Sequence, residues 1–159
     1  MVRKIIFVRH AHSGQQHGVV DDFHRPLSKR GLREAKEIGE KIRKQKFIPR
    51  LIISSASLRT SSTAYIIAEQ LGINPELIQK TNSIYESSPQ EYLNLIAKQE
   101  ESTDFIMFVG HNPAITSLAF YWEIETKGIL PGEGFVCEGT AETWKDWLTS
   151  KKIKGEMIK

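Results

Sequence analysis

The sequence predicts an α/β protein, a three-layer α/β/α sandwich around a mostly parallel central sheet. Short runs of consecutive apolar residues alternate with segments whose apolar residues recur at helical spacing. The apolar runs are continuous rather than alternating, which is typical of strands buried on both faces of a parallel sheet. A helix start signal precedes each helical segment, so strands and helices alternate through most of the chain.

The first half contributes two strands and two helices. Strands are predicted at Ile5 to Val8 and at Leu51 to Ile53. Ser28 can cap a helix over about 29 to 44, and Ser57 can cap one over about 58 to 71 that stops at Gly72. The apolar residues expected on the inner faces of these helices are Leu32, Ala35, Ile38, Ile42, Ala64, Ile67, Ala68 and Leu71.

The second half repeats the pattern and ends less clearly. Ser88 and Pro89 open a capping box for a helix that carries Tyr92, Leu93 and Ile96. A strand is predicted at Phe105 to Val109, and a helix follows Asn112-Pro113 with Ile115, Leu118, Ala119 and Trp122. Later strands are possible at 134 to 137 and 156 to 158, after a loop rich in glycine and acidic residues.

Composition bounds the class of protein. At 159 residues, 40% hydrophobic and 26% charged, the chain matches one ordinary globular domain, expected to span residues 1–159. The apolar runs are too short for a signal peptide or a membrane span, and the single cysteine, Cys137, suits a reducing compartment. The net charge of +3, without interleaved aromatic and basic residues, argues against nucleic acid. We therefore expect a cytoplasmic protein that binds neither membranes nor nucleic acid.

Polar residues follow three predicted strands at the point where each ends. Arg9 and His10 follow the first strand, Arg59 lies in the first turn of the helix after the second, and His111 follows the third. Each signal alone is weak, because a histidine after a strand is usually structural. The carboxyl ends of parallel strands meet at one sheet edge, however, so we expect the four side chains to lie together. With nearby helix N-termini they would form an anion site, and phosphate is the expected ligand.

The chain contains, in order, the segments VRHAHS, HRPLSKRG, LIISSASLRTSSTA, IYESSPQEYLNLI and FVGHNP. Together they resemble the histidine phosphatase superfamily, and within it the small SixA-type phosphohistidine phosphatases. The resemblance covers about the first 120 residues and extends loosely beyond them. It implies a phosphoglycerate-mutase-like fold and a phosphatase that needs no metal or other cofactor. Only about fifty residues separate Arg59 from His111, so we expect no lid insertion and an open site.

The resemblance also implies roles for individual residues. His10 corresponds to the nucleophile that takes the phosphoryl group, and Arg9, Arg59 and His111 correspond to the rest of the phosphate pocket. Arg25 lies in a recurring family segment, and Ser13 is a further expected phosphate-binding residue.

The chemistry of the residues agrees with these roles. An imidazole is neutral near pH 7 and can attack without a separate base, while arginines bind phosphate oxygens bidentately. We expect His111 to act as an imidazolium that donates to an equatorial phosphoryl oxygen.

A general acid for the leaving group is the weak point of this assignment. Asn112 follows the second histidine and cannot act as an acid. Glu86 is the nearest candidate but could equally be a solvated residue before a helix, and Asp21 and Asp22 are more distant candidates. Phosphohistidine makes an acid dispensable, because its P–N bond is labile and the imidazole can leave already protonated.

The sequence leaves three functions open. The first is a phosphatase whose substrate is phosphohistidine on another protein, and the second is a phosphatase of small phosphoesters that uses Glu86 as its acid. The third is a phosphate- or phosphoprotein-binding module without turnover, against which the presence of all four pocket residues argues. Two further histidines are expected outside the chemistry: His12 points to solvent, and His24 replaces a more usual acidic residue, so that an interaction of Arg25 would be lost.

Overall fold

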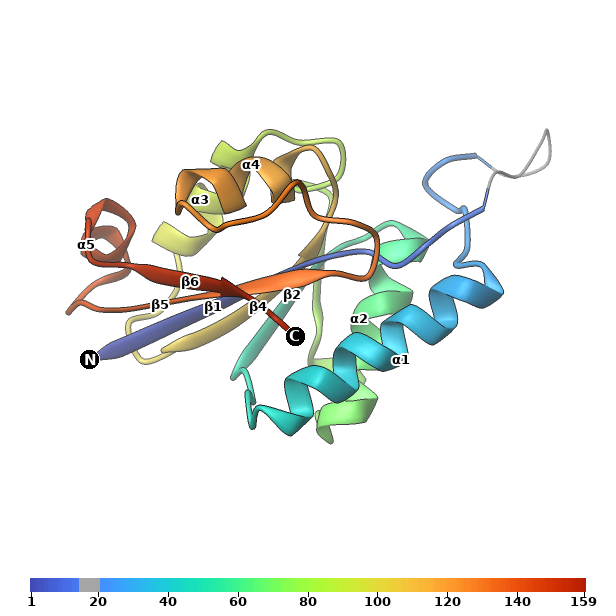
Figure 1. Cartoon of the computed structure of the whole chain (residues 1–159), viewed down its shortest axis with the longest axis horizontal. Coiled ribbons are helices and arrows are strands. Elements are labelled where there is room, and N and C mark those ends of the chain that lie inside the picture. The colour runs from blue at the N-terminus through green and yellow to red at the C-terminus, as the bar shows by residue number, and fades with distance from the viewer. Residues whose placement is uncertain (15–20) are drawn as a thin grey trace.

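A six-stranded sheet lies between two layers of helices in this computed structural model, which describes residues 1–14 and 21–159 (Figure 1). The strand order is β3-β2-β4-β1-β5-β6. The parallel part contains β1 (Val2–Arg9), β2 (Leu51–Ser55), β3 (Gln79–Thr81) and β4 (Phe105–Gly110). Next to β1 lies β5 (Gly134–Thr140), followed by the edge strand β6 (Lys154–Met157), and both are antiparallel to their neighbours. The predicted three-layer, mostly parallel α/β class is confirmed.

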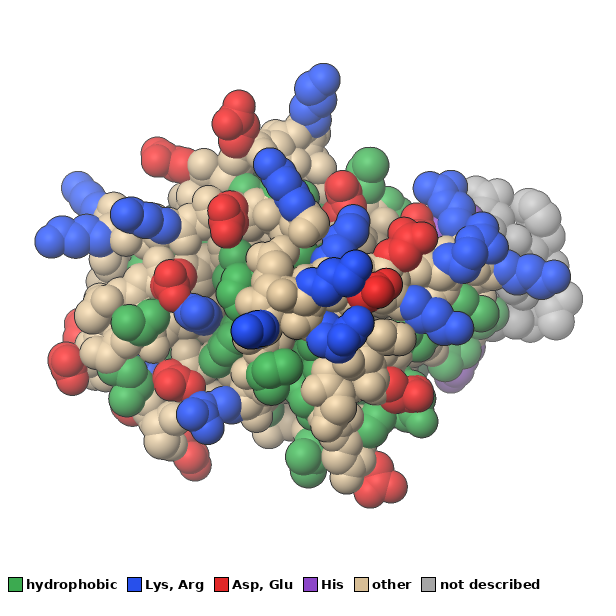
Figure 2. Space-filling model, turned by 60° about the horizontal axis from the view of Figure 1, so that its bottom comes forward, with side chains coloured by type: hydrophobic (Ala, Val, Ile, Leu, Met, Phe, Trp, Pro, Cys, Tyr) green, Lys and Arg blue, Asp and Glu red, His purple; other side chains and the backbone are tan. Residues whose placement is uncertain are grey.

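In the described part of the chain, five α-helices cover the sheet. On one face lie α1 (Lys29–Lys44) and α2 (Leu58–Leu71), and on the other lie α3 (Pro89–Ala97), α4 (Ala114–Tyr121) and α5 (Trp144–Thr149) (Figure 1). A short 3₁₀ helix, η1 (Pro75–Leu77), precedes β3. Seen from the side on which α1 lies, the surface carries many Lys and Arg side chains with acidic ones among them (Figure 2). No helix in the described part of the chain is long and apolar enough to cross a membrane.

The hydrophobic core is divided in two by the sheet. Alternate side chains of β1 point to opposite faces, so Ile5 and Phe7 pack toward α3, α4 and α5, whereas Ile6 and Val8 pack toward α1 and α2. All four side chains are fully buried. This burial on both faces explains why the central strands read as continuous apolar runs.

The pairing of β1 with β4 places the two halves of the expected site side by side. Arg9 lies opposite Gly110 in the parallel register, and the backbone N–H of His10 donates to the carbonyl of Gly110 across 3.0 Å. The residues that follow these strands, His10 and His111, therefore leave the sheet together at its carboxyl edge.

Most of the predicted helices are confirmed, with one error on an inner face. Ser28 caps α1 by accepting a hydrogen bond from the N–H of Gly31. Leu32, predicted to face inward, is 44% exposed. Gly31 occupies the inner position instead, because a β-carbon there would lie 2.0 Å from the carbonyl oxygen of His12. The close approach of the two backbones turns Leu32 outward.

Two predicted caps do not form as expected, and one helix was not predicted. Ser57 and Ser88 occupy the N-cap positions of α2 and α3, but neither side chain makes the capping hydrogen bond. The sequence analysis missed α5, whose Trp144 and Trp147 are fully buried. Its start signal is Thr143, whose hydroxyl accepts from the N–H of Asp146.

Candidate active site

The four predicted pocket residues meet at the carboxyl edge of the sheet. Arg9 ends β1, His10 follows it, His111 follows β4, and Arg59 lies in the first turn of α2. The ring centres of His10 and His111 are 5.3 Å apart. Arg59 reaches the ring of His10, with 3.4 Å between its Nε and Nε2 of the histidine. The sequence prediction that these side chains lie together is confirmed by these contacts.

His10 is held as a neutral imidazole with one nitrogen free for chemistry. Its Nδ1 lies 2.7 Å from the carbonyl oxygen of Ala11, which can only accept, so Nδ1 carries the proton. Nε2 therefore keeps its lone pair and accepts the hydrogen bond from Arg59. Burial lowers the pKa of His10 to about 4, opposed by the bond to Ala11 and reinforced by the charges of Arg59 and Arg9. Near neutral pH, Nε2 of His10 is thus an available nucleophile.

Arg59 is oriented by Asp22, a residue that precedes α1. The guanidinium donates from Nη1 to the carbonyl of Asp22 across 2.6 Å and from Nη2 to its carboxylate across 3.0 Å. Arg59 is 5% exposed, so its charge is compensated by Asp22 rather than by water. The same carboxylate accepts from the Tyr85 hydroxyl across 2.5 Å, and this bond, together with the Arg59 charge, holds the pKa of Asp22 below its usual value. Asp22 is therefore ionised near neutral pH.

Arg9 lies between the two histidines and the loop before β5. Its Nη1 donates to the carbonyl of Ile129 across 2.9 Å, while its buried Nε has no partner among the described residues. The positive charge of Arg9 contributes to lowering the pKa values of both His10 and His111. A bound anion would relieve this uncompensated charge.

His111 is surrounded by three buried hydroxyl groups. Its Nε2 lies 2.9 Å from Oγ of Ser55, and 3.4 Å from both Oγ of Ser57 and Oγ1 of Thr60. Ser57 and Thr60 also bond to one another. This network explains why Ser57 does not cap α2: its hydroxyl turns toward the site.

The hydrogen-bond partners of Ser55 determine which nitrogen of His111 carries the hydrogen. Ser55 is fully buried, and its oxygen accepts from the N–H of Ser57 across 3.4 Å. Among the described residues, the hydroxyl hydrogen of Ser55 has one acceptor within reach, Nε2 of His111. Nε2 is therefore unprotonated, and Nδ1 carries the hydrogen.

The expectation of an imidazolium at position 111 is wrong for the free protein. The pKa of His111 is lowered to about 3, mainly by burial and also by the charges of His10 and Arg59, with Asp22 opposing them. His111 is thus a neutral donor through Nδ1, because the site is buried and already holds two arginines.

Two tyrosines contact His111, one at its ring and one at its backbone. The ring of Tyr85 lies 5.5 Å from that of His111, and burial and the bond to Asp22 raise the Tyr85 pKa to about 12. The hydroxyl of Tyr92 accepts from the backbone N–H of His111 across 3.2 Å. A β-carbon at Gly110 would lie 1.9 Å from this hydroxyl, so only glycine allows the approach.

Ser13 and Arg25, both predicted to bind phosphate, hold the loops around the site in the free protein. The Ser13 hydroxyl donates to the carbonyl of Pro26 across 2.7 Å, which uses its one hydrogen. Arg25 donates to the carboxylate of Asp22 across 3.1 Å and to the carbonyl of Ser13 across 3.2 Å. Arg25 therefore has an acidic partner, Asp22, although position 24 holds a histidine.

The remaining predicted residues lie at the rim or serve the fold. Glu86 is exposed, has a φ of 49°, and makes no hydrogen bond or ion pair with the rest of the described chain. Asn112 accepts from the N–H of Thr116 and donates to Ile129. His12 does not point freely to solvent as predicted: it is half-buried, with Nδ1 2.6 Å from Oγ of Ser28.

Sequence reasoning missed several residues of the site or gave them no role. Asp22 was only a distant candidate for the acid, and Tyr85, Tyr92, Ser55 and Thr60 were not singled out. A signal existed for the hydroxyl groups, because the stretch SSASLRT places polar side chains where a buried strand ends. No comparable signal pointed to Asp22, whose partners in the site, Arg59 and Tyr85, are distant in sequence.

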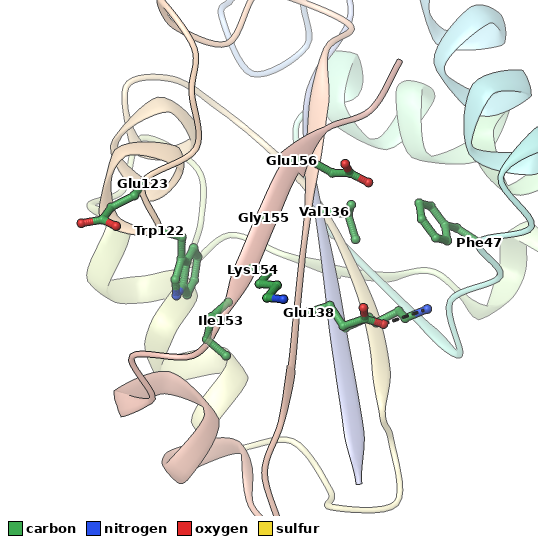
Figure 3. Close-up of a pocket in the computed structure, with 10 residues that line it drawn as sticks. Phe47, Trp122, Glu123, Val136, Glu138, Ile153, Lys154, Gly155 and Glu156 are labelled. Atoms are coloured by element: carbon green, nitrogen blue, oxygen red, sulfur yellow. Dashed lines mark ion pairs between the residues drawn. The ribbon is translucent and has the colours of Figure 1, made fainter.

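A second pocket lies beside β6, where Trp122 and Ile153 line one side of the strand, and Phe47 and Val136 line the other (Figure 3). Its charged contact is the ion pair between Lys4 and Glu138, 3.1 Å long. The described residues that line it include neither histidine nor cysteine. Nowhere in residues 1–14 and 21–159 do three His, Cys, Asp or Glu side chains form a group that could hold a metal ion.

Comparison with known families and proteins shows similarity to one protein family and to a plant protein. The profile of the histidine phosphatase superfamily (branch 1) matches residues 5–86, just over half of the chain. A chloroplast protein of Arabidopsis thaliana, itself uncharacterised, is 32% identical over 118 residues, which are 69% of this chain and 54% of the relative. The chain therefore spans about half the length of that curated relative.

Solved structures share the fold at lower identity. A protein assigned as phosphohistidine phosphatase SixA from Agrobacterium tumefaciens is 24% identical, with a TM-score of 0.81 over 99% of this chain and 96% of that one. The protein histidine phosphatase SixA complexed with tungstate is 15% identical, with a TM-score of 0.69 over 86% and 87%. A mycobacterial glucosyl-3-phosphoglycerate phosphatase is 14% identical, with a TM-score of 0.67 over 99% and 97%. At these identities the likeness is one of fold.

Proposed function

Because this chain belongs to the histidine phosphatase superfamily, we propose that it is a phosphatase that works through a covalent phosphoryl intermediate on His10 and needs no metal. Its preferred substrate is phosphohistidine on another protein. The observation that carries the proposal is the state of His10, which is neutral with Nε2 free and directed at Arg59. A nucleophile and its phosphate-binding cations are thus in place without further rearrangement of the histidine.

In the first step, Nε2 of His10 attacks phosphorus, so that a new P–N bond forms while the bond to the leaving group breaks. The leaving imidazole takes the electron pair of the broken bond. His10 becomes positively charged, and the carbonyl of Ala11, 2.7 Å from Nδ1, stabilises that charge. In the second step, water attacks phosphorus, phosphate departs, and Nε2 recovers its lone pair.

Positive groups stabilise the charge on the equatorial phosphoryl oxygens. Arg9 has a buried nitrogen without a partner, and Arg59 contacts His10 directly. His111 adds a neutral donor at Nδ1. Binding the phosphoryl group requires Arg59 to exchange part of its contact with Asp22 for phosphate oxygens. Asp22 thus positions Arg59 in the free protein and competes with the substrate for it.

The state of the carboxyl groups favours phosphohistidine over a phosphoester. An alcohol leaving group needs a proton from an acid, whereas a protonated imidazole does not. The pKa of Asp22 is lowered, so Asp22 is a poor acid near neutral pH. Asn112 has no acidic proton to donate. Two neighbours of the same fold carry the name phosphohistidine phosphatase or protein histidine phosphatase, which supports the same substrate class.

A small phosphoester is the second candidate substrate, with Glu86 as general acid. Glu86 follows Tyr85, whose ring lies against His111, and its charge contributes to raising the Tyr85 pKa, so the carboxylate lies near the mouth of the site. A neighbour of the same fold is a glucosyl-3-phosphoglycerate phosphatase, which acts on such a substrate by its name.

The proposal is tested by measuring phosphate release without added metal from a phosphohistidine-bearing protein and from a simple phosphoester. An alkaline quench and intact mass would show the phosphoryl adduct. We expect turnover of the phosphohistidine substrate, with none for His10→Ala and normal turnover for His24→Ala, which changes an exposed histidine bound to Asp21. Phosphate binding without turnover of either substrate would instead identify a binding module, and turnover of the ester alone would favour the second candidate.

A further inference from the structure

A large groove adjoins the site on the side of Arg9. It runs between α4 and the loop before β5, and Arg9 and Asn112 form its end nearest the site. Its volume is about 1380 Å³, above the roughly 300–1,000 Å³ of typical small-molecule pockets. The mechanism does not use this groove beyond Arg9.

The charges that line the groove are mostly positive. Arg9, Lys41 of α1, Lys127 of the loop and Lys159 contribute positively charged side chains, and Glu133 contributes a negatively charged one. None of the three lysine side chains forms an ion pair with any residue that the structure describes, and all three are exposed. Lys41 lies in the last turn of α1, together with Arg43 and Lys44. The groove therefore has unpaired cations available for a ligand of opposite charge.

Two large apolar side chains stand in the same groove. Phe120 at the end of α4 is 55% exposed, and Leu130 in the loop is 63% exposed. Isolated apolar residues at a surface are common, but here two of them line one cationic groove that also contains Arg9 of the site. Together they offer a bound ligand apolar contact area in addition to the positive charges of the groove.

We propose that this groove docks an acidic polypeptide segment, namely the part of the substrate protein that flanks its phosphohistidine. This inference rests on the proposed function and names the kind of protein that the site serves. Three observations select a polypeptide: the groove exceeds the size of a metabolite pocket, its lysines form no ion pair with any described residue, and it shares Arg9 with the site. Acidic side chains would pair with Lys41 and Lys127, and an apolar side chain would cover Phe120 or Leu130.

Charge-swapped peptides test the proposal. Two synthetic peptides carry one histidine phosphorylated with phosphoramidate, flanked either by Glu and Leu or by Lys and Leu, and phosphoimidazole serves as a substrate too small to reach the groove. We expect kcat/KM for the acidic peptide to exceed that for the basic peptide by about tenfold. The difference should arise from KM rather than from kcat, and added salt should reduce it. In Lys41→Glu/Lys127→Glu the preference should reverse, while turnover of phosphoimidazole stays unchanged.

Control variants separate docking from other effects. Lys36→Glu makes the same charge change on an exposed position of α1 outside the groove and should behave like the wild type.

Equal rates on both peptides by the wild type would overturn the docking proposal and leave the proposed function standing, provided that phosphoimidazole turns over. A parallel loss on the peptides and on phosphoimidazole in the double variant would point to damage to the site and also overturn it. If the double variant sediments differently from the wild type but has the same KM for the peptides, the docking proposal is overturned and the groove is assigned to a second copy of the chain. If the wild type turns over none of the three substrates, the proposed function itself fails.

Discussion

The hydroxyl of Ser55 donates to Nε2 of His111 across 2.9 Å, at a position where both residues are buried. The second histidine of the site is therefore fixed as its Nδ1–H tautomer by a side chain at the end of the neighbouring strand. Proteins often set the tautomer of a functional imidazole through the hydrogen bond on its other nitrogen. Here the donor is a hydroxyl, which favours the neutral form.

Ser55→Ala should release the tautomer of His111. Without the donor, Nε2 can take the hydrogen, and the pKa of His111 should rise by about one unit, since one hydrogen bond contributes about 1 kcal/mol. Nitrogen-15 NMR at neutral pH would show a single Nδ1–H tautomer in the wild type and a mixture in the variant. Ser54→Ala is the matched control, because the Ser54 hydroxyl bonds to the Ser55 carbonyl and not to His111. A wild-type spectrum of the Nε2–H tautomer would refute the assignment.

The two buried histidines should make the protein less stable in acid. The pKa values of His10 and His111 are lowered to about 4 and about 3, from an unfolded value near ~6.5. As pH falls below about 6.5, the unfolded chain takes up protons before the folded one does, so the free energy of unfolding falls until the folded pKa values are passed. Denaturant unfolding between pH 7 and pH 4 would measure this slope, which should flatten in His10→Gln/His111→Gln. An equally steep slope in the double variant would assign the acid sensitivity to other groups.

Asp22→Asn should tighten the binding of inorganic phosphate. The carboxylate of Asp22 occupies Nη2 of Arg59 in the free protein, and its negative charge repels an anion at the same place. Removing that charge should lower the Kd for phosphate by about three- to tenfold, as expected for one charge interaction of about 1 kcal/mol. Calorimetric titration gives the Kd. Asp21→Asn is the control: it changes the neighbouring exposed carboxylate, which bonds to His24, and should leave the Kd for phosphate unchanged. Weaker phosphate binding in Asp22→Asn would show that Asp22 matters more for positioning Arg59 than for competing with the anion.

Gly110→Ala should disturb both the fold and the site. The added methyl would overlap the Tyr92 hydroxyl, which supports the backbone of His111. Overpacking of this kind typically costs about 1–3 kcal/mol of unfolding free energy. Combining it with Tyr92→Phe removes the overlapping oxygen and should recover part of the loss in a denaturation experiment. If the double variant is as unstable as the sum of the two single changes, the clash with Tyr92 is not the cause.

Glu86→Gln separates the two candidate substrates. If Glu86 protonates an alcohol leaving group, the variant should lose roughly 10²-fold or more in kcat on a phosphoester. Turnover of phosphohistidine should be unaffected, because its leaving group needs no acid. Initial rates on both substrates measure the difference, with Glu91→Gln in the first turn of α3 as a control. Equal rates of the variant and the wild type on the ester would exclude Glu86 as the acid.

The order of elements could be predicted because it depends on local features of the sequence. Continuous apolar runs give the buried strands, and Ser28 and Gly72 mark the ends of helices whose inner faces are apolar. The meeting of Arg9, His10, Arg59 and His111 followed from the rule that parallel strands end at one edge. These inferences need no knowledge of side-chain packing.

The parts that could not be predicted depend on contacts between distant residues. Asp22 and Arg59 are 37 residues apart, and a surface-like DDFH segment does not reveal that its second carboxylate will bind an arginine of another helix. The neutral state of His111 depends on how deeply it is buried, which no spacing of residues records. Leu32 was misplaced for the same reason, since the approach of Gly31 to His12 is a tertiary contact.

The position of β4 has a consequence for when the candidate site forms during folding. In the sheet β4 lies between β1 and β2, although it follows both in sequence, and β1 pairs with it across roughly a hundred residues. Such long-range pairing is slow, because the intervening chain must be ordered before the contact forms. A growing or partly folded chain thus carries His10 from the start but lacks the partner strand that places His111 beside it. The appearance of turnover during refolding would therefore report the moment at which the sheet is completed.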